Sequence, residues 1–290
     1  MKNINKFIRK IPPKVAVLTT RIFLPLGVLS LVSSCMQYAH FANQEDRILT
    51  PDFKDTFDIP PPPDGSTGRT IQLWATSYHT TRPISDKNGV PFRDINGVPI
   101  SDNVSKKDWC LGAQEGSIKT TFNGKEIRIT DDGTFISKRS YSIDCALVLG
   151  SKNYDSYSRS YHIKTNAPFG LGIYNYFLVP YRSMAVHLND KDGLKLKRGD
   201  VLYIKDVTKN IVTDPYTGKK FKHDGYFFVA DVGGKVKDNH ADTFCGFKED
   251  CLPPFTGGSQ DNHILSTALI ITDPAIREKL KRMHLKTSYK

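Results

Sequence analysis

One stretch, residues 225–246, constrains the fold of this chain more than any other, and it reads GYFFVADVGGKVKDNHADTFCG. An apolar run ends at Asp231, two glycines follow, and a second aspartate, Asp242, comes after a polar loop. An apolar run that stops at a Gly-Gly pair is typical of a strand entering a tight turn. Gly233 and Gly234 can adopt a positive φ without a Cβ clash, so the chain can reverse there. We therefore expect Asp231 and Asp242 at the ends of neighbouring strands, facing one cleft.

The residues around Asp231 indicate what such a carboxyl could do. Strand alternation places Asp231 on the same face as Phe227 and Val229, which is apolar. A carboxyl on that face loses hydration, so its pKa rises and it can donate a proton near about pH 6–7. Enzymes that cut sugars often use acids in this way. The alternative interpretation is that Asp231 and Asp242 only cap turns, where aspartate is common.

The positive charge of the chain is concentrated at its start. The formal charge of the 290 residues is +11. Residues 1–34 hold six basic residues and no acidic one, which leaves 35 basic against 30 acidic side chains in the rest. No basic stripe with interleaved aromatic residues remains, so we expect no nucleic-acid partner. The apolar run of residues 22–32 is short for a membrane span and is typical of a signal peptide.

This segment closes on LVSSC, which ends at Cys35. Small residues before a cysteine resemble the lipobox of bacterial lipoproteins, in which the cysteine is lipidated. Met36 after it resembles the pattern of lipoproteins sorted to an outer membrane. The resemblance implies a signal peptide over residues 1–34 and a lipid anchor at Cys35, which holds the exported protein in the envelope, facing the periplasm. A short uncleaved membrane anchor is the alternative.

The other four cysteines form an even set in an exported chain, which favours disulfides. Three pairings are possible. We favour Cys110–Cys145, which would close an inserted region, and Cys245–Cys251, which would close the loop after Asp242. A zinc site is the rival, but the sequence contains no CxxC pair.

Histidines close to the two aspartates in sequence raise the question of a metal site. The candidate set is His223, Asp224, Asp231 and His240. Loop histidines are more often solvated, and nothing fixes this spacing as an HExxH motif would. We expect no metal ion and no other cofactor.

Composition divides the chain further. Residues 35–69 are rich in polar residues and proline, so we expect a tether with a stiff stem at the prolines of residues 60–63. The alternative is an extended arm packed along the domain. Residues 70–81 alternate as a strand, and residues 119–135 form a hairpin around Asn123-Gly124. Much of the interval from residue 82 to residue 178 has a weak pattern.

Order returns in the C-terminal part. Residues 199–207 and 264–273 read as strands, and Asp273-Pro274 caps a basic amphipathic helix over residues 274–290. Short strands joined by turns, with one helix at the end, predict a mainly β chain that forms a small barrel.

The signature of the opening stretch resembles that of the 3D (three-aspartate) domain family, which includes membrane-bound lytic transglycosylase A. The matching residues are Asp231, Gly233, Gly234, Val236, Lys237 and Asp242. Three companion segments, ATSYHTTRP, YRSMAVHL and LKRGDVLYI, resemble family segments in the family order.

The resemblance implies a six-stranded double-psi β-barrel over residues 70–273, with an inserted β-rich region at about residues 82–178. It implies that Asp242 is the single catalytic acid/base and that Asp231 orients it or stabilises positive charge. It also implies substrate contacts from the residues Tyr78, Gly233, Gly234, Lys237 and Arg182.

The activity that this implies is cleavage of the β-1,4 bond between N-acetylmuramic acid and N-acetylglucosamine in peptidoglycan, with formation of a 1,6-anhydro end. The expected partners are peptidoglycan glycan strands, and we expect a monomer. Two departures stand against the family pattern: His187 occupies the place of a family aspartate, with Asp190 nearby, and residues 82–181 are short for a second wall of the cleft. The alternatives are a non-catalytic wall-binding lipoprotein and a hydrolytic glycosidase.

Overall fold

The computed structural model describes residues 55–66, 68–133, 143–172, 175–188, 193–251, 258–259 and 262–285. The predicted signal peptide, Cys35 and Asp190 lie outside these residues. Among the residues that are described, no helix has both the length and the apolar character needed to cross a membrane.

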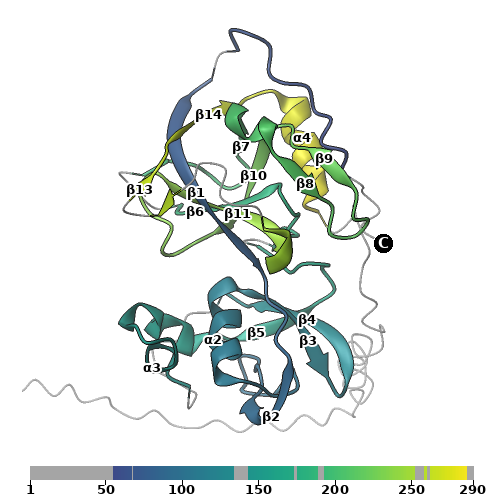
Figure 1. Cartoon of the computed structure of the whole chain (residues 1–290), viewed down its shortest axis with the longest axis vertical. Coiled ribbons are helices and arrows are strands. Elements are labelled where there is room, and N and C mark those ends of the chain that lie inside the picture. Colours follow the sequence, from purple (N-terminus) through teal and green to yellow (C-terminus); the bar gives the residue numbers. More distant parts are fainter. Residues whose placement is uncertain are drawn as a thin grey trace, which may run out of the picture. The chain divides into compact units, whose positions relative to one another are not determined.

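Six strands form a closed barrel in the order β1, β11, β6, β10, β7, β14 (Figure 1). Their bounds are Thr70–Thr80 for β1, Ser183–Val186 for β6, Val201–Ile204 for β7, Tyr226–Val232 for β10, His240–Phe247 for β11 and Ser266–Ile271 for β14. β1 pairs in parallel with β11, and β6 pairs in parallel with β10. The other four neighbouring pairs are antiparallel. The prediction of a mainly β chain is confirmed.

Alternation along these strands produces the barrel interior. The side chains that point inwards form a single apolar cluster from all six strands: Leu73, Ala75, Met184, Val186, Leu202, Ile204, Phe227, Val229, Ala241 and Ala268. Each large side chain buried in this way contributes about 1.5–3 kcal/mol. The residues between them point outwards, and some of these, such as Tyr226, Phe228 and Ala230, are buried in a second apolar cluster outside the barrel.

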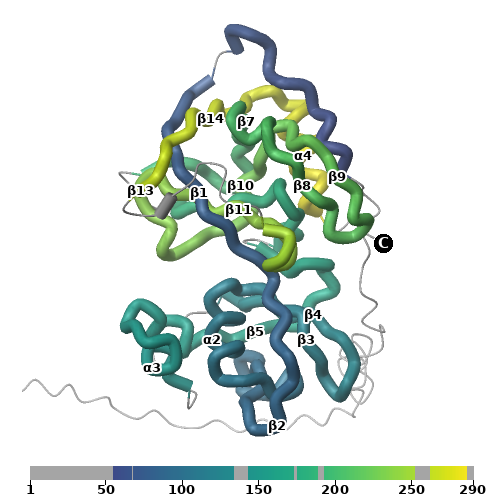
Figure 2. Tube along the Cα trace, viewed as in Figure 1, coloured from purple at the N-terminus to yellow at the C-terminus, as the bar shows by residue number. Residues whose placement is uncertain are grey.

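The chain leaves the barrel at the end of β1 and returns at β6 (Figure 2). The inserted elements are β2 (Ser85–Val90), α2 (Lys106–Glu115), β3 (Ser117–Phe122), β4 (Lys125–Asp131), α3 (Cys145–Leu149), the 3-10 helix η1 (Lys152–Arg159) and β5 (His162–Thr165). β3, β4 and β5 form a three-stranded sheet. A separate core, which includes Phe92, Trp109, Ile118 and Ile129, lies under the helices and this sheet.

Two expectations for the insertion have different outcomes. The hairpin around Asn123-Gly124 is present as β3 and β4, and both turn residues have a positive φ, 52° and 72°. The region expected to be β-rich contains four strands, β2 to β5, and also the helices α2, α3 and η1, which the sequence did not predict. Helix α2 is set by its ends: the Ser105 hydroxyl accepts from Asp108 N–H at 3.0 Å, and Gly116 ends the helix with φ 77°.

The remaining elements lie between the barrel strands, or after the last of them, in the sequence. They are η3 (Lys205–Lys209), β8 (Ile211–Thr213), β9 (Lys220–Lys222), η4 (Lys248–Asp250), β12 (Gly258–Ser259), β13 (Asn262–His263) and α4 (Pro274–Met283). The Asp273 carboxylate accepts from Ala275 N–H and Ile276 N–H at 2.8 and 3.0 Å, so the predicted cap of the final helix is present.

The segment expected to be a tether packs on the barrel from Asp55 onwards, which corrects that part of the prediction for residues 35–69. We call residues 55–63 the N-terminal arm. Phe57 is 8% exposed and Ile59 4% exposed, and the Tyr226 hydroxyl donates to Pro60 O at 2.8 Å. The prolines keep this arm extended, but its apolar side chains are buried, as in the alternative of a packed arm.

Candidate active site

Asp231 and Asp242 lie in one row of residues that crosses four strands of the barrel. Asp231 of β10 is opposite Ala185 of β6, Ala185 is also opposite Asp242 of β11, and Asp242 is opposite Thr76 of β1. Opposed residues of neighbouring strands point to the same face of a sheet. The two carboxyl groups therefore share the outer face of the barrel, with β6 between their strands. The predicted proximity holds, but the two strands are not direct neighbours.

A register shift in β10 decides the direction of Asp231. Val229 pairs with Met184 and Asp231 pairs with Ala185, so two residues of β10 oppose one of β6 at this point. Such a bulge changes the face to which the next side chain points. Asp231 therefore lies outside the barrel, and the prediction that it shares the apolar face of Phe227 and Val229 is wrong. Strict alternation cannot anticipate a bulge.

The Asp242 carboxylate is held by two side chains. The Thr76 hydroxyl donates to Oδ1 of Asp242 and lies 2.7 Å from Nε2 of His240. Nε2 of His240 is 3.3 Å from the same Oδ1. Because Thr76 has one proton and gives it to Asp242, its oxygen accepts from His240 Nε2–H. This chain of donors fixes the direction of the carboxylate, as a reacting acid requires.

His240 is itself fixed by stacking. The centre of its ring lies 3.8 Å from that of the Trp74 ring, and the two ring planes are 6° apart. Trp74 of β1 and His240 of β11 are partners in the strand register, so both side chains lie on the same face as Asp242. The His263 ring of β13 is 4.6 Å from the same indole. Trp74 thus holds the imidazole in the plane that contacts Thr76.

Tyr78 lies two residues after Thr76 and therefore on the same face of β1. Its hydroxyl oxygen is buried beside the Asp231 carboxylate, and its ring lies 5.1 Å from that of Phe244. Burial, followed by the negative charges of Asp231, Asp242 and Glu115, raises the pKa of Tyr78 well above its usual range. The hydroxyl keeps its proton and is a hydrogen-bond donor among three carboxyl groups.

Glu115, the last residue of α2, is a site residue that sequence reasoning missed. Main-chain bonds join the insertion to the end of β1, since Thr81 N–H donates to Ser117 O at 2.9 Å and Lys119 N–H to Thr81 O at 2.8 Å. This places Oε2 of Glu115 3.0 Å from His79 N–H. Burial, with the charge of Asp242 adding to it, raises the pKa of Glu115 to about 7, although the His79 N–H bond acts in the opposite direction.

Tyrosines from the 3-10 helix η1 also belong to these surroundings. Tyr157 feels the charges of Glu115 and Asp242, which add to burial in raising the pKa of its hydroxyl. The Nζ of Lys235, from the loop between β10 and β11, lies 5.2 Å from the Tyr154 ring and 4.9 Å from the Tyr157 ring. The same amine donates to Asn153 O. Aromatic rings at this place offer flat apolar faces on which a ligand could stack.

The glycines of the signature have a role different from the predicted one. Neither Gly233 nor Gly234 has a positive φ, and Asp238 has one instead, at 57°. A Cβ on Gly233 would lie 2.2 Å from Cγ2 of Val236, so this glycine allows a close approach within the turn. Lys237 is exposed, and its carbonyl accepts from His240 N–H at 3.0 Å. Contact of these residues with a substrate stays a prediction.

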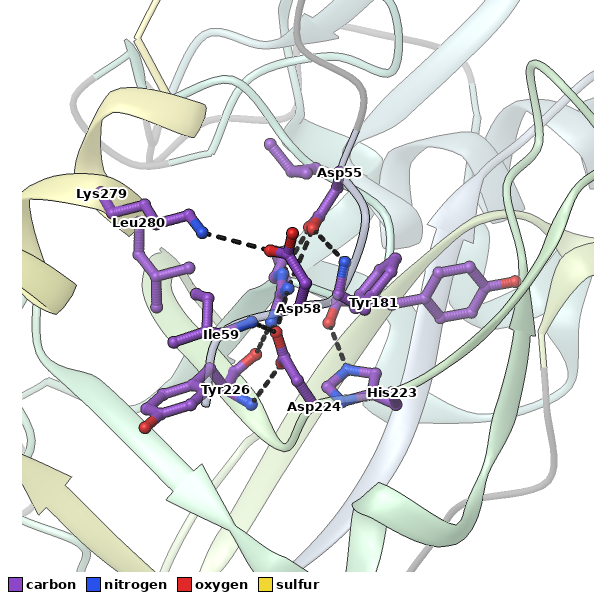
Figure 3. Close-up of polar contacts among 12 residues, drawn as sticks. Asp55, Asp58, Ile59, Tyr181, His223, Asp224, Tyr226, Lys279 and Leu280 are labelled. Atoms are coloured by element: carbon purple, nitrogen blue, oxygen red, sulfur yellow. Dashed lines mark hydrogen bonds and ion pairs between the residues drawn. The ribbon is translucent and has the colours of Figure 1, made fainter. Parts of the chain in front are cut away.

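Arg182 does not present its guanidinium to a ligand, which corrects its prediction as a substrate contact. It is fully buried and pairs with Asp55 and with Asp224, to which Nη2 donates at 2.7 Å. Its Nη1 also donates to Tyr226 O at 2.9 Å. Figure 3 shows Asp55, Asp224 and Tyr226 converging on this point. The match to a family segment identified the position but not its burial.

The structure forms both disulfides that the sequence favours, Cys110–Cys145 and Cys245–Cys251. The first joins α3 to α2, the helix that ends at Glu115. In the described part of the chain no three His, Cys, Asp or Glu side chains come together as metal ligands would. His187, directly after β6, is half-buried, and its Nδ1 has no hydrogen-bond partner among the described residues.

The sequence matches no protein-family profile and no curated protein. Several solved structures are similar to it. Escherichia coli MltA with bound chitohexaose is 13% identical with a TM-score of 0.42, over 70% of this chain and 72% of that one. A membrane-bound lytic murein transglycosylase from Agrobacterium tumefaciens is 15% identical with a TM-score of 0.38, over 74% and 76%. LtgG of Burkholderia pseudomallei, a lytic transglycosylase, is 14% identical with a TM-score of 0.30, over 69% and 71%. At these identities and TM-scores the likeness assigns neither a family nor an activity to this chain.

The site can hold and move a proton. Asp242 is directed by Thr76 and His240, Tyr78 is a neutral donor, and Glu115 is a carboxyl that is neutral for part of the time near pH 7. Thr76 and Tyr78 are two residues apart in β1 and therefore share one face. This spacing could have placed both on the face of Asp242 once the pairing of β1 with β11 was known. No signal in the sequence connects Glu115 to this site, because only the tertiary contact with His79 brings it there.

Proposed function

We propose that this protein is a peptidoglycan lytic transglycosylase in which Asp242 is the catalytic acid/base. The observation that carries the proposal is the position of the Asp242 carboxylate, outside the barrel wall and directed by the Thr76 hydroxyl and His240. The three-aspartate signature, which includes Asp231 and Asp242, gives this acid its substrate class. A positioned carboxyl of this kind contributes about 10²–10⁴-fold to a proton-transfer reaction.

The proposed reaction needs one carboxyl group and no water. Asp242 protonates the oxygen between N-acetylmuramic acid and N-acetylglucosamine, and the bond from C1 to that oxygen breaks. The C6 hydroxyl of the same N-acetylmuramic acid attacks C1, and its proton returns to Asp242. The products are a free hydroxyl on one fragment and a 1,6-anhydro end on the other. Asp231, in the same row of residues, would orient Asp242 or stabilise the positive charge on the sugar.

The test is digestion of purified sacculi with the soluble domain, followed by mass spectrometry of the released fragments. We expect anhydro ends from the native protein and a loss of at least about 100-fold in rate for Asp242→Asn. Asp206→Asn is a matched control, since Asp206 is exposed on η3. An Asp242→Asn variant that still releases anhydro fragments would refute the assignment.

One observation favours hydrolysis as a second candidate. Hydrolytic glycosidases use a pair of carboxyl groups. Glu115 supplies a second carboxyl group near Asp242, since the charges of both raise the pKa of Tyr157. Reducing ends in place of anhydro ends would identify this reaction. Retention of the domain on sacculi without any release would identify a non-catalytic wall-binding lipoprotein.

We further propose a double-psi arrangement for the barrel, supported by its two parallel pairs, β1 with β11 and β6 with β10. We also propose that the protein is exported, lipid-anchored at Cys35 in the outer membrane facing the periplasm, and monomeric. Labelling with a radioactive fatty acid tests the anchor: the native protein should take up label and a Cys35→Ser variant should not.

A further inference from the structure

The carboxyl group of Glu115 is mostly buried and lacks a strong counter-charge. Its side chain is 14% exposed, and Oε2 contacts the N–H of His79 at 3.0 Å and Nδ1 of the same residue at 3.4 Å. Burial, together with the charge of Lys248, lowers the pKa of His79, so this imidazole is neutral near pH 7. Both contacts are made by Oε2, and among the described residues none donates a hydrogen bond to Oε1.

The groups that face Glu115 come from four elements. They are Tyr78 and His79 of β1, Asp242 of β11, Lys248 of η4 and Tyr157 of η1. The hydrogen bond from His79 N–H and, after it, the charge of Lys248 oppose the effects of burial and of the Asp242 charge on the carboxyl. The C-terminal end of α2, which carries partial negative charge, acts in the same direction as burial. These surroundings hold the pKa of Glu115 at about 7 and keep much of it protonated at neutral pH.

We propose that Glu115 enters the reaction as a neutral carboxylic acid and donates a hydrogen bond from Oε1 to an acceptor oxygen of the bound glycan, next to the bond that Asp242 protonates. The inference rests on the proposed cleavage of glycan strands. Peptidoglycan sugars carry N-acetyl groups, whose carbonyl oxygens are strong acceptors. An ionised carboxyl at the same place has no proton to give and would repel such an oxygen. Glu115 therefore makes glycan binding depend on pH.

Binding separates this role from the chemistry of Asp242. In an Asp242→Asn background, which cannot cleave and also lacks one of the charges that raise the pKa of Glu115, the affinity for the N-acetylglucosamine hexamer chitohexaose is measured by calorimetry at pH 5 and at pH 8.5. We expect binding to weaken about tenfold at the higher pH, the usual loss when one hydrogen bond to a charged or buried group is removed. In Asp242→Asn with Glu115→Gln the affinity should be the same at both values, because the amide donates at either pH. Glu278→Gln, on the exposed face of α4, is the matched control and should keep the pH dependence.

Activity gives an independent readout. Glu115→Gln alone should digest sacculi at pH 7 and should retain more of its rate at pH 8.5 than the native protein does. If Glu115 acted only as a nearby charge, Glu115→Gln would lose more of its rate at pH 8.5 than the native protein does. If Glu115 were the proton donor itself, Glu115→Gln would be inactive at every pH. Either result, or an unchanged pH profile, overturns the inference.

The inference and the proposed function fail in different ways. Release of anhydro fragments by the native protein, with equal pH dependence of binding with and without Glu115→Gln, overturns the inference alone. Absence of both release and chitohexaose binding in every variant overturns the proposed function and the inference with it.

Discussion

The hydroxyl of Thr76 is the smallest group on which the site depends. It donates to Asp242 and accepts from His240, so it links the acid to the stacked imidazole. A hydrogen bond to a charged group contributes about 1.5–3 kcal/mol, and its loss also leaves the carboxylate free to rotate. The effect belongs to the orientation of Asp242 and should appear in the chemical step.

Thr76→Val removes this hydroxyl and keeps the shape of the side chain. We expect kcat for the release of muropeptides to fall about 10–100-fold, with little change in KM. Thr76→Ser keeps the hydroxyl and should retain most of the rate. Equal losses in both variants would assign the effect to the packing of β1 rather than to the hydrogen bond.

At this scale the motif selected two aspartates that lie in one row of the barrel, and it missed their surroundings. Asp231 and Asp242 could be identified because the signature names them directly. The direction of Asp231 could not, since a bulge between Val229 and Asp231 reverses the face that alternation predicts. Glu115 could not either, because no local pattern records a contact between residues 36 positions apart in sequence.

The N-terminal arm is an element that behaves as part of the barrel. Asp55 of the arm and Asp224, just before β10, share the fully buried Arg182. Burial opposes the ionisation of Asp55, but the guanidinium overcomes this and lowers its pKa below the usual value. The arm, the start of β6 and the start of β10 are therefore joined by one charged cluster.

Arg182→Met should unfold at a lower urea concentration, with a loss of about 3–5 kcal/mol, because it leaves two buried carboxylates without a partner. The measurement is equilibrium unfolding followed by circular dichroism. Arg282→Met is the control, since that side chain is 71% exposed and its loss should cost less than about 1 kcal/mol. A similar effect from both changes would mean that the cluster contributes no net stability.

Elements with local signals were predicted well, and those set by tertiary contacts were not. The β3–β4 hairpin has an Asn-Gly turn, and α4 has an Asp-Pro start, so both could be located in the sequence. Helix α2 has few apolar residues at helical spacing and depends on packing of Trp109 and on Cys110 in its disulfide. The arm resembled a tether in the sequence because proline favours an extended chain both in a solvated tether and in an arm packed on a domain.

At the scale of the whole molecule, three histidines of the described residues are buried and neutral. Burial lowers the pKa of His162 to about 3, and it lowers the pKa values of His223 and His284 to about 4. In the unfolded chain these groups take up protons below about pH 6.5. The unfolded state thus binds more protons, and stability falls as the pH falls through that value. Glu115 has the opposite sign, because its pKa is higher in the folded state.

The sum of these effects predicts an acid-sensitive protein. When the pH falls from 7.5 to 5.5, the three histidines should lower the free energy of unfolding by about 4 kcal/mol, and Glu115 should raise it by about 2 kcal/mol. The net loss is about 2 kcal/mol. Urea unfolding at the two pH values measures it. Glu115→Gln, which abolishes the compensating term, should increase the loss. Stability that is constant or higher at pH 5.5 would contradict the assignment of neutral histidines.

The order of the barrel strands has a consequence for how the chain reaches its native state. β1 is made first, yet its partners are β11 and β14, and Gln72 bonds to Thr267 across 195 residues. The insertion is built from near neighbours in sequence and has its own core and disulfide. Local contacts form quickly and distant ones slowly. We therefore expect the insertion to fold before β1 pairs with β11 and β14. Helix α2, which carries Glu115, would then be formed before Asp242 of β11 is placed beside it.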